Sequence, residues 1–227
     1  MLQRLLCLTL LALTPVIATG LDLDSVLANM DRAAAGFESM QATITRLKYM
    51  ALLDEKTTES GEIFVRKDKD GSVRLLINFK EPYVYHVAIG GNTAEIYKPR
   101  IARVEAYDIT KHRDTFQQAF LLGFGTSADY LRKNYELRLL GEEKAAGRNA
   151  VKLELTPKSK EARKQVPKLD LWVSTEIWQA VQQKPYQTGG EDYRIFTYTD
   201  VTLNPKFADK AFKLDIPKKT KRVFPRR

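Results

Sequence analysis

The sequence contains very little that could act as a covalent or metal-binding anchor. Its 227 residues include one cysteine, Cys7, and two histidines, His86 and His112. Cys7 lies within a hydrophobic N-terminal segment, so the rest of the chain can form no disulfide and offers no thiol. Neither histidine has a second histidine or a cysteine at the spacing of a metal site. We therefore expect no metal, no cofactor and no disulfide, and a fold held together by its hydrophobic core.

Long hydrophobic runs are also missing, apart from one near the start of the chain. Residues 5–13 are apolar except for Thr9, Arg4 precedes them, and a small residue follows at Ala18. This order is typical of a cleaved signal peptide, with an uncleaved N-terminal anchor as the alternative. No later segment approaches the roughly 18 apolar residues of a transmembrane helix. We expect residues 1–20 to direct export to the periplasm and then to be removed.

Patterns that mark a catalytic site are absent as well. Ser127 lacks the glycine two positions later that a nucleophile elbow requires, because Asp129 stands there, and a helix cap explains this serine. Gly90 and Gly91 are followed by Asn92 and not by the Gly-Lys-Ser/Thr of a phosphate loop, so they suit a hairpin turn. The sequence therefore predicts that the protein is not an enzyme; an enzyme acting on lipids is the alternative.

The balance of charge is basic, with 37 Lys and Arg against 28 Asp and Glu. Such a balance suits nucleic acid, anionic lipid or acidic proteins as partners. Export, and the lack of a recognition helix or an aromatic RNA-binding signature, argue against nucleic acid. Six of the last ten residues are Lys or Arg. We expect residues 218–227 to be an unstructured basic tail that either contacts acidic partners or anionic headgroups or remains solvated.

What the sequence has in quantity is short alternating segments separated by polar turns. One amphipathic helix is expected first, over residues 23–37, after which the period changes to that of strands. Residues 73–80 alternate large apolar side chains with polar ones, although Leu76 breaks the pattern. About ten or eleven such strands are expected, interrupted by two short helices within residues 114–133. Strands at this spacing predict a barrel or a sandwich, built as one domain over residues 21–217.

The helical insertion is bounded by Gly123 and Gly125, which predict a flexible joint. Phe116, Phe120 and Phe124 recur every four residues, so they present one apolar stripe to the sheet. An insertion of this kind suggests a lid, and a lid implies a cavity. The same three rings could equally seal a permanent core, in which case they would make as many fixed contacts as the sheet does.

Four motifs, taken in order, resemble the LolA family of outer-membrane lipoprotein carriers. They are Gln41–Arg46 (QATITR), Gly61–Lys67 (GEIFVRK), Ala88–Pro99 (AIGGNTAEIYKP) and Val151–Lys158 (VKLELTPK). The resemblance covers most of residues 22–217. It implies a mainly β fold, an unclosed antiparallel barrel or half-pipe of about ten or eleven strands. The N-terminal helix and the short helical insertion would cover its apolar hollow.

The resemblance also implies a function and partners. Members of the family ferry acylated lipoproteins through the periplasm, from an inner-membrane release transporter to an outer-membrane acceptor, and we expect the same of this chain as a monomer. A carrier or sensor of another envelope lipid with the same fold is the alternative. The family has a functional arginine directly before a proline, after its second strand; here Lys67 precedes Asp68, with Arg66 alongside. Arg66 and Lys67 are the candidate lid latches, and the departure indicates a divergent branch with a different lipid cargo.

The predicted binding surface is the apolar face of the sheet together with the lid. Burial of an acyl chain contributes about 0.8 kcal/mol per CH₂, so a lipid that leaves a bilayer needs an apolar shelter. A shift of one residue exchanges the two faces of a strand, so the sequence leaves open which face lines the cavity. The residues expected to line it are Leu75, Ile77, Tyr85, Val87, Ile96, Leu153, Leu155, Leu171 and Val173 on the sheet, and Phe116, Phe120 and Leu121 on the lid.

Overall fold

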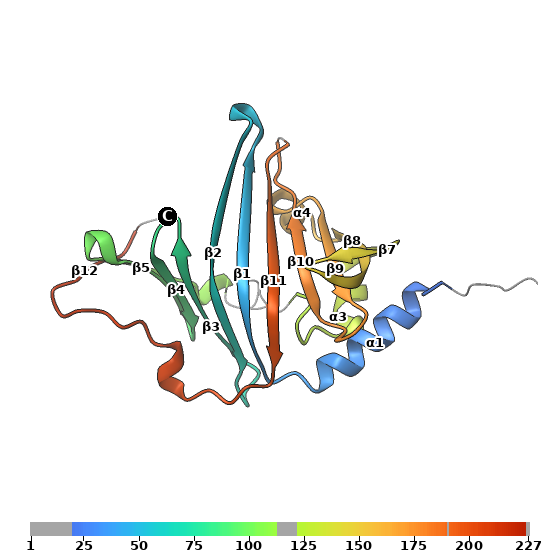
Figure 1. The fold of residues 1–227 in the computed structure, drawn as a ribbon, viewed down its shortest axis with the longest axis horizontal. Helices are drawn as coiled ribbons and strands as arrows, with labels where there is room; N and C mark the ends of the chain where they lie inside the picture. Colours follow the sequence, from blue (N-terminus) through green and yellow to red (C-terminus); the bar gives the residue numbers. More distant parts are fainter. Residues whose placement is uncertain (1–19, 113–121, 190, 226–227) are drawn as a thin grey trace, which may run out of the picture.

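The computed structural model describes residues 20–112, 122–189 and 191–225. Within them, twelve strands form a single sheet in the order β12-β6-β5-β4-β3-β2-β1-β11-β10-β9-β8-β7 (Figure 1). The strands are β1 Ser39–Met50, β2 Glu55–Lys67, β3 Val73–Glu81, β4 Tyr85–Gly90, β5 Thr93–Lys98, β6 Arg103–Asp108, β7 Tyr135–Ala145, β8 Arg148–Pro157, β9 Leu169–Ser174, β10 Ala180–Pro185, β11 Tyr193–Leu203 and β12 Lys221–Val223. The helices are α1 Leu23–Ala35, α3 Ala128–Asn134 and α4 Lys160–Gln165, and the 3₁₀ turns are η1 Ala51–Leu53, η2 Pro99–Ile101, η3 Thr110–His112 and η4 Asp209–Phe212.

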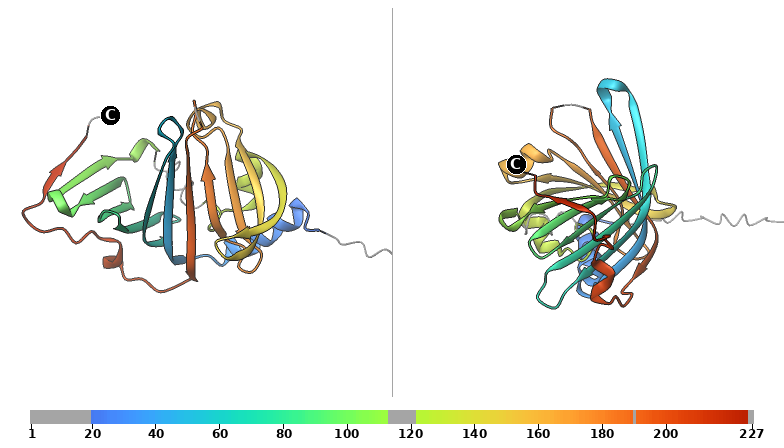
Figure 2. Two further views of the ribbon diagram at one scale, coloured as in Figure 1. Left: turned by 45° about the horizontal axis from the view of Figure 1, so that its top comes forward. Right: turned by 90° about the vertical axis from the view of Figure 1, so that its left-hand side faces the viewer.

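The sheet is open, as the predicted half-pipe requires. Its two outermost strands, β7 and β12, lie at opposite ends of the strand order. Figure 2 shows that the sheet is strongly curved, with both ends turned toward the same side. Neighbouring strands are antiparallel except β12, which pairs parallel to β6. The prediction of an unclosed, mainly antiparallel barrel is therefore confirmed, with one strand more than expected.

Pairing between β1 and β11 joins two halves of the sheet that are each built from successive hairpins. The strands β1 to β6 follow one another along the chain, and so do β7 to β11. The chain returns along β11 beside β1, where Ile44 pairs with Tyr198. The hairpin of β1 and β2 extends beyond its neighbours (Figure 1), and Leu52 at its tip is 95% exposed.

The first helix begins at Leu23, as the sequence predicts, and ends at Ala35, two residues earlier than expected. Asp22 caps α1 by accepting a hydrogen bond from the Ser25 amide at 2.7 Å, and Gly36 follows its last turn. Its buried residues are Val26, Leu27 and Met30. They pack in one cluster with apolar side chains of the sheet, on the face that we call the inner face.

The second helix of the insertion is confirmed, whereas most of the first lies outside the described residues. Ser127 caps α3, accepting from the Tyr130 amide at 3.2 Å, as the sequence predicts. Buried Leu131 joins α3 to the same core as α1. Of the helix expected over residues 114–122, only Leu122 is described, and it is buried.

The expectation of a flexible joint at residues 123–125 is wrong, because this segment is buried and pinned. Gly123 accepts a hydrogen bond from the Ala180 amide at 2.8 Å. Phe124 is 1% exposed, with its ring at the edge of the Tyr198 ring. Gly123 has a φ of +83°, and a Cβ atom there would collide with Ala180. Glycine is present at this position for close packing and for backbone conformation, since other residues are disfavoured at positive φ.

Three segments are more regular than the sequence indicates. Strand β2 begins at Glu55, six residues before the motif that starts at Gly61, because its pairing with β1 continues to the end of the hairpin. The charged connection after β8 forms α4, capped by Ser159. The basic tail is not wholly unstructured: the free edge of β6 pairs with Lys221–Val223 as β12.

Candidate functional site

The inner face of the sheet carries a continuous apolar surface. Across four neighbouring strands, Ile63 pairs with Ile77, Ile77 with Val87, and Val87 with Ile96. Directly paired residues share a face of a sheet, so this row points to one side. By the same registers, the structure places all nine sheet residues predicted for the cavity on the inner face: Leu75, Ile77, Tyr85, Val87, Ile96, Leu153, Leu155, Leu171 and Val173.

The half of the inner face on β7 to β11 is covered by helices. Leu153, Leu155, Leu171 and Val173 are all 0% exposed. They belong to one cluster with buried residues of α1 and α3 and with Phe124. These four side chains are packed as a core, so a ligand could reach them only if the helices moved, and their role in binding stays a prediction.

The half on β3 to β6 is only partly covered. Leu75 and Ile77 are buried at 1% and 7% exposure, whereas Tyr85, Val87 and Ile96 are partly exposed. Ala94 and Tyr107 lie on the same face and are also partly exposed. We call this surface the open half, defined by Tyr85, Val87, Ala94, Ile96 and Tyr107. The predicted lid residues Phe116, Phe120 and Leu121 lie outside the described residues.

Polar groups border the open half where Tyr85 begins β4. The Tyr85 hydroxyl accepts a hydrogen bond from Arg46 at 2.7 Å and donates one to Glu59 at 3.1 Å. Arg46 also forms an ion pair with Glu59, and its guanidinium lies 5.0 Å from the centre of the Phe79 ring. Burial raises the pKa of Tyr85 well above its usual range, so its hydroxyl remains protonated at physiological pH. The three groups form a compact, neutral set.

A second polar set lies on β5 and β6. Glu105 pairs with Ile96 across the strands, and it accepts from Lys98 at 2.9 Å. The hydrogen bond from Lys98, followed by the positive charges of Lys98 and Arg103, holds the pKa of Glu105 below its usual value. Arg103 lies 3.3 Å from the same carboxylate, and the Tyr107 hydroxyl donates to it at 3.3 Å. We call the two sets together the polar band: Arg46, Glu59, Tyr85, Lys98, Arg103, Glu105 and Tyr107.

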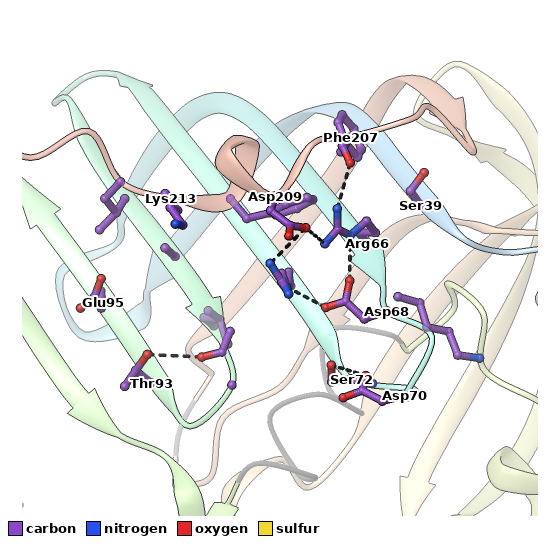
Figure 3. A pocket seen from close by; sticks show the side chains of 18 of the residues that line it. Ser39, Arg66, Asp68, Asp70, Ser72, Thr93, Glu95, Phe207, Asp209 and Lys213 are labelled. Carbon is purple, nitrogen blue, oxygen red and sulfur yellow. Dashed lines mark hydrogen bonds and ion pairs between the residues drawn. The ribbon is translucent and has the colours of Figure 1, made fainter.

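A large cavity lies on the opposite face of the sheet, the outer face. It measures about 1400 Å³ and separates the outer face of β1 to β5 from residues 205–216 of the C-terminal segment, which we call the strap. Phe207 and Phe212 of the strap pack on a small outer cluster that includes Leu76 and Ala88. About half of the residues that line the cavity are charged, among them Arg66, Asp68 and Asp209 (Figure 3). It is therefore a poor shelter for an acyl chain, because hydrocarbon would have to replace the water around those charges.

Arg66, one of the two predicted latches, holds the strap. Figure 3 shows its guanidinium between Asp68 and Asp209, at 2.8 and 2.6 Å, and it also donates to the Phe207 carbonyl oxygen at 2.9 Å. The hydrogen bond from Arg66 lowers the pKa of Asp209. The Lys67 side chain is exposed, and the backbone amide of Lys67 donates a hydrogen bond to the Glu38 carbonyl oxygen. Arg66 lies on the outer face, so the structure gives it a partner other than the helical insertion.

Arg66→Met should release the strap. The substitution removes the two contacts of Arg66 with the strap, an ion pair with Asp209 and a hydrogen bond to Phe207, together with its ion pair to Asp68. It keeps an apolar side chain against Phe212. We expect amide hydrogen exchange at Ala211 and Lys213 to become roughly tenfold faster, with little change in the sheet. Lys67→Met is the matched control and should leave exchange unchanged. Equal effects of the two substitutions would show that Arg66 does not hold the strap.

The remaining chemical candidates offer little. The Nδ1 atom of His86 donates a hydrogen bond to the side-chain oxygen of Asn78 at 2.8 Å, and the ring stacks on Tyr97. Burial lowers the pKa of His86. Among the described residues, no group of three or more His, Cys, Asp or Glu side chains could hold a metal ion. No helix in the described part of the chain is long and apolar enough to span a membrane. The inner face is therefore the strongest candidate site.

Comparison with known proteins shows where the chain belongs. A family model described as "-like: Uncharacterized protein" matches residues 90–212, which is more than half of the chain. No curated protein matches this chain. Among solved structures, MucB is 18% identical with a TM-score of 0.51, over 84% of this chain and 62% of its own. An uncharacterized conserved protein from Thermus thermophilus is 11% identical with a TM-score of 0.55, over 89% of this chain and 98% of its own.

A LolA superfamily protein is also among the similar structures. This protein, from Nitrosomonas europaea, is 14% identical with a TM-score of 0.41, over 85% of this chain and 97% of its own. The chain spans only about 62% of the length of MucB. At such low identities the likeness is one of fold. The chain belongs to the family whose model matches residues 90–212, and it shares its fold with MucB and the Thermus thermophilus protein.

Proposed function

We propose that the protein is a carrier of the cell envelope that binds acyl chains on the open half of its inner face. The observation that carries this proposal is the row Ile77, Val87 and Ile96, which continues a buried apolar core into a partly exposed surface. A contiguous apolar patch that remains exposed is typical of an interaction or ligand-binding site. Because the sheet is curved, this row lies on one of its two sides, the inner face.

The cargo and the route follow from the resemblance to the LolA family. The cargo would be acylated lipoproteins, taken from an inner-membrane release transporter and delivered to an outer-membrane acceptor. Residues 1–20 would direct the chain to the periplasm, where it would act as a monomer. A carrier must also release its cargo, and a surface that is only partly enclosed binds less tightly than a sealed cavity.

A carrier or sensor of another envelope lipid is the second candidate, and the polar band favours it. An acyl chain attached to a protein by an ester or amide bond brings no charge of its own. The polar band places charged side chains beside the apolar row, and an uncharged acyl chain forms no favourable interaction with them. We propose binding in preference to catalysis, because the charged groups of the band pair with one another.

Native mass spectrometry of protein taken from the periplasm, without detergent, tests the proposed function. We expect the wild-type chain to carry a lipid adduct that Val87→Asp lacks. An acylated polypeptide as the adduct would identify a lipoprotein carrier, and a free lipid would identify the second candidate. Absence of any adduct, together with no uptake of added fatty acid, would contradict the proposal. Hydrolysis of an added lipid ester would replace it with an enzyme.

A further inference from the structure

The charges of the polar band do not cancel. Arg46 and Glu59 neutralise each other, but Lys98 and Arg103 share the single carboxylate of Glu105. Lys221 of β12 pairs in register with Arg103 and adds a further positive charge at the edge of the same region. One end of the open half is therefore positively charged.

The cations remain available to a ligand. The side chains of Lys98 and Arg103 are 42% and 43% exposed, whereas that of Glu105 is 12% exposed. The Nε atom of Arg103 is buried and makes no hydrogen bond, although it lies 3.3 Å from Glu105 in the ion pair. A guanidinium also offers a planar pair of donors that matches a carboxylate or a phosphate.

The cations also stand at the correct place relative to the apolar row. Lys98 pairs with Arg103, and Ile96 lies two residues before Lys98 on the same face of β5. Ile96 in turn pairs with Val87. An extended chain lying on Val87 and Ile96 would therefore have its polar end within reach of Lys98. The apolar tail would lie on the apolar row, and the polar headgroup would lie beside the cations.

We propose that the inner face binds an amphiphile with an anionic headgroup, a carboxylate or a phosphate, and that Lys98 and Arg103 bind this headgroup. The inference rests on the proposed function, since it assigns the polar end of a ligand whose tail lies on the open half. Lys98 provides a compact positive charge and Arg103 a directional pair of donors. Arg46 is already paired with both Glu59 and Tyr85 and positions the tyrosine. The headgroup is therefore bound by Lys98 and Arg103 and not by Arg46.

Binding of three matched probes tests the proposal. The probes are a fluorescent long-chain fatty acid, the methyl ester of the same acid, and a lysophosphatidic acid of equal chain length. We expect the wild-type protein to bind both anionic probes roughly tenfold more tightly than the ester, the effect of about one charge-assisted hydrogen bond. Added salt should reduce this preference, because Lys98 and Arg103 are partly exposed and screened. The ratio of the two anionic affinities then identifies the preferred headgroup.

Lys98→Gln and Arg103→Gln should each remove most of the preference while leaving the affinity for the ester unchanged. Glutamine retains a donor for Glu105, which limits the loss of stability, and melting temperatures would show whether each variant folds. Lys221→Gln, on the exposed edge strand, provides a further variant with little risk to folding. Lys80→Gln is the matched control, since Lys80 is 61% exposed and pairs with Glu62 on the outer face.

The outcomes distinguish failure of the headgroup site from failure of the proposed carrier function. A preference for anionic probes that falls in the band variants and not in Lys80→Gln supports the headgroup site. Equal affinity of the wild-type protein for acid, ester and lysophosphatidic acid overturns the headgroup site and leaves the carrier intact. No binding of any probe overturns both.

Discussion

Val87→Asp is expected to reduce the affinity for a long-chain fatty acid by at least tenfold while the protein stays folded. Val87 lies in the middle of the apolar row, paired with Ile77 on one side and Ile96 on the other. A carboxylate there would have to lose water when an acyl chain covers it, and unpaired burial of charge is costly. Without a ligand the side chain is partly exposed, so the charge can remain hydrated. Fluorescence titration of the fatty acid measures the effect.

The control for Val87→Asp is Val84→Asp, which makes the same chemical change nearby. Val84 is 52% exposed and lines a small depression on the outer face. Binding should be unchanged in this variant. Equal loss of affinity in both variants would indicate a general effect of negative charge, and unchanged affinity in Val87→Asp would remove the open half as the binding surface.

Leu155→Asp is expected to unfold the protein and not merely to abolish binding. Leu155 is 0% exposed in the core beneath α1 and α3, although the sequence predicts it as part of the cavity. An uncompensated charge at such a position costs several kcal/mol, a large share of the roughly 5–15 kcal/mol that stabilises a typical domain. Circular dichroism against temperature should show no cooperative transition, or one that is lowered by tens of degrees.

Leu140→Asp provides the comparison for this buried site, because Leu140 lies on the neighbouring β7 and is 43% exposed. Its melting temperature should change by only a few degrees. A folded Leu155→Asp protein with normal stability would contradict the account of a sealed half. It would show that the wall under the helices is accessible, and that the cavity extends across the whole sheet.

The alternation of apolar and polar residues predicts the inner face well. Leu153 and Leu155 of β8 alternate with Lys152 and Glu154 and lie on the inner face. Leu75 and Ile77 of β3 lie there too, although Leu76 between them is apolar and packs in the outer cluster. Alternation decides which residues share a face, because successive side chains of a strand point to opposite sides. It contains no information about what covers that face. The sequence therefore predicts nine sheet residues as one continuous lining, whereas the structure divides them between a packed half and an open half.

Long-range contacts account for what the sequence does not predict. The strap is held by Arg66 and Asp209, which are 143 positions apart in the chain. The polar band combines Arg46 with Tyr85, and no local pattern indicates that these two residues meet. Gly61 belongs to one of the four motifs, and the structure explains it: a Cβ atom there would collide with the backbone of Asn78. Such pairings depend on the curvature of the sheet and on strand register.

Photo-crosslinking with a fatty acid that carries a diazirine along its chain tests the central claim most directly. The label should be found on residues 85–98, the strands β4 and β5 of the open half, and should disappear in Val87→Asp. Labelling confined to residues 205–216 would place the chain in the outer cavity beneath the strap. That result, or no specific labelling at all, would contradict an acyl-binding surface on the inner face.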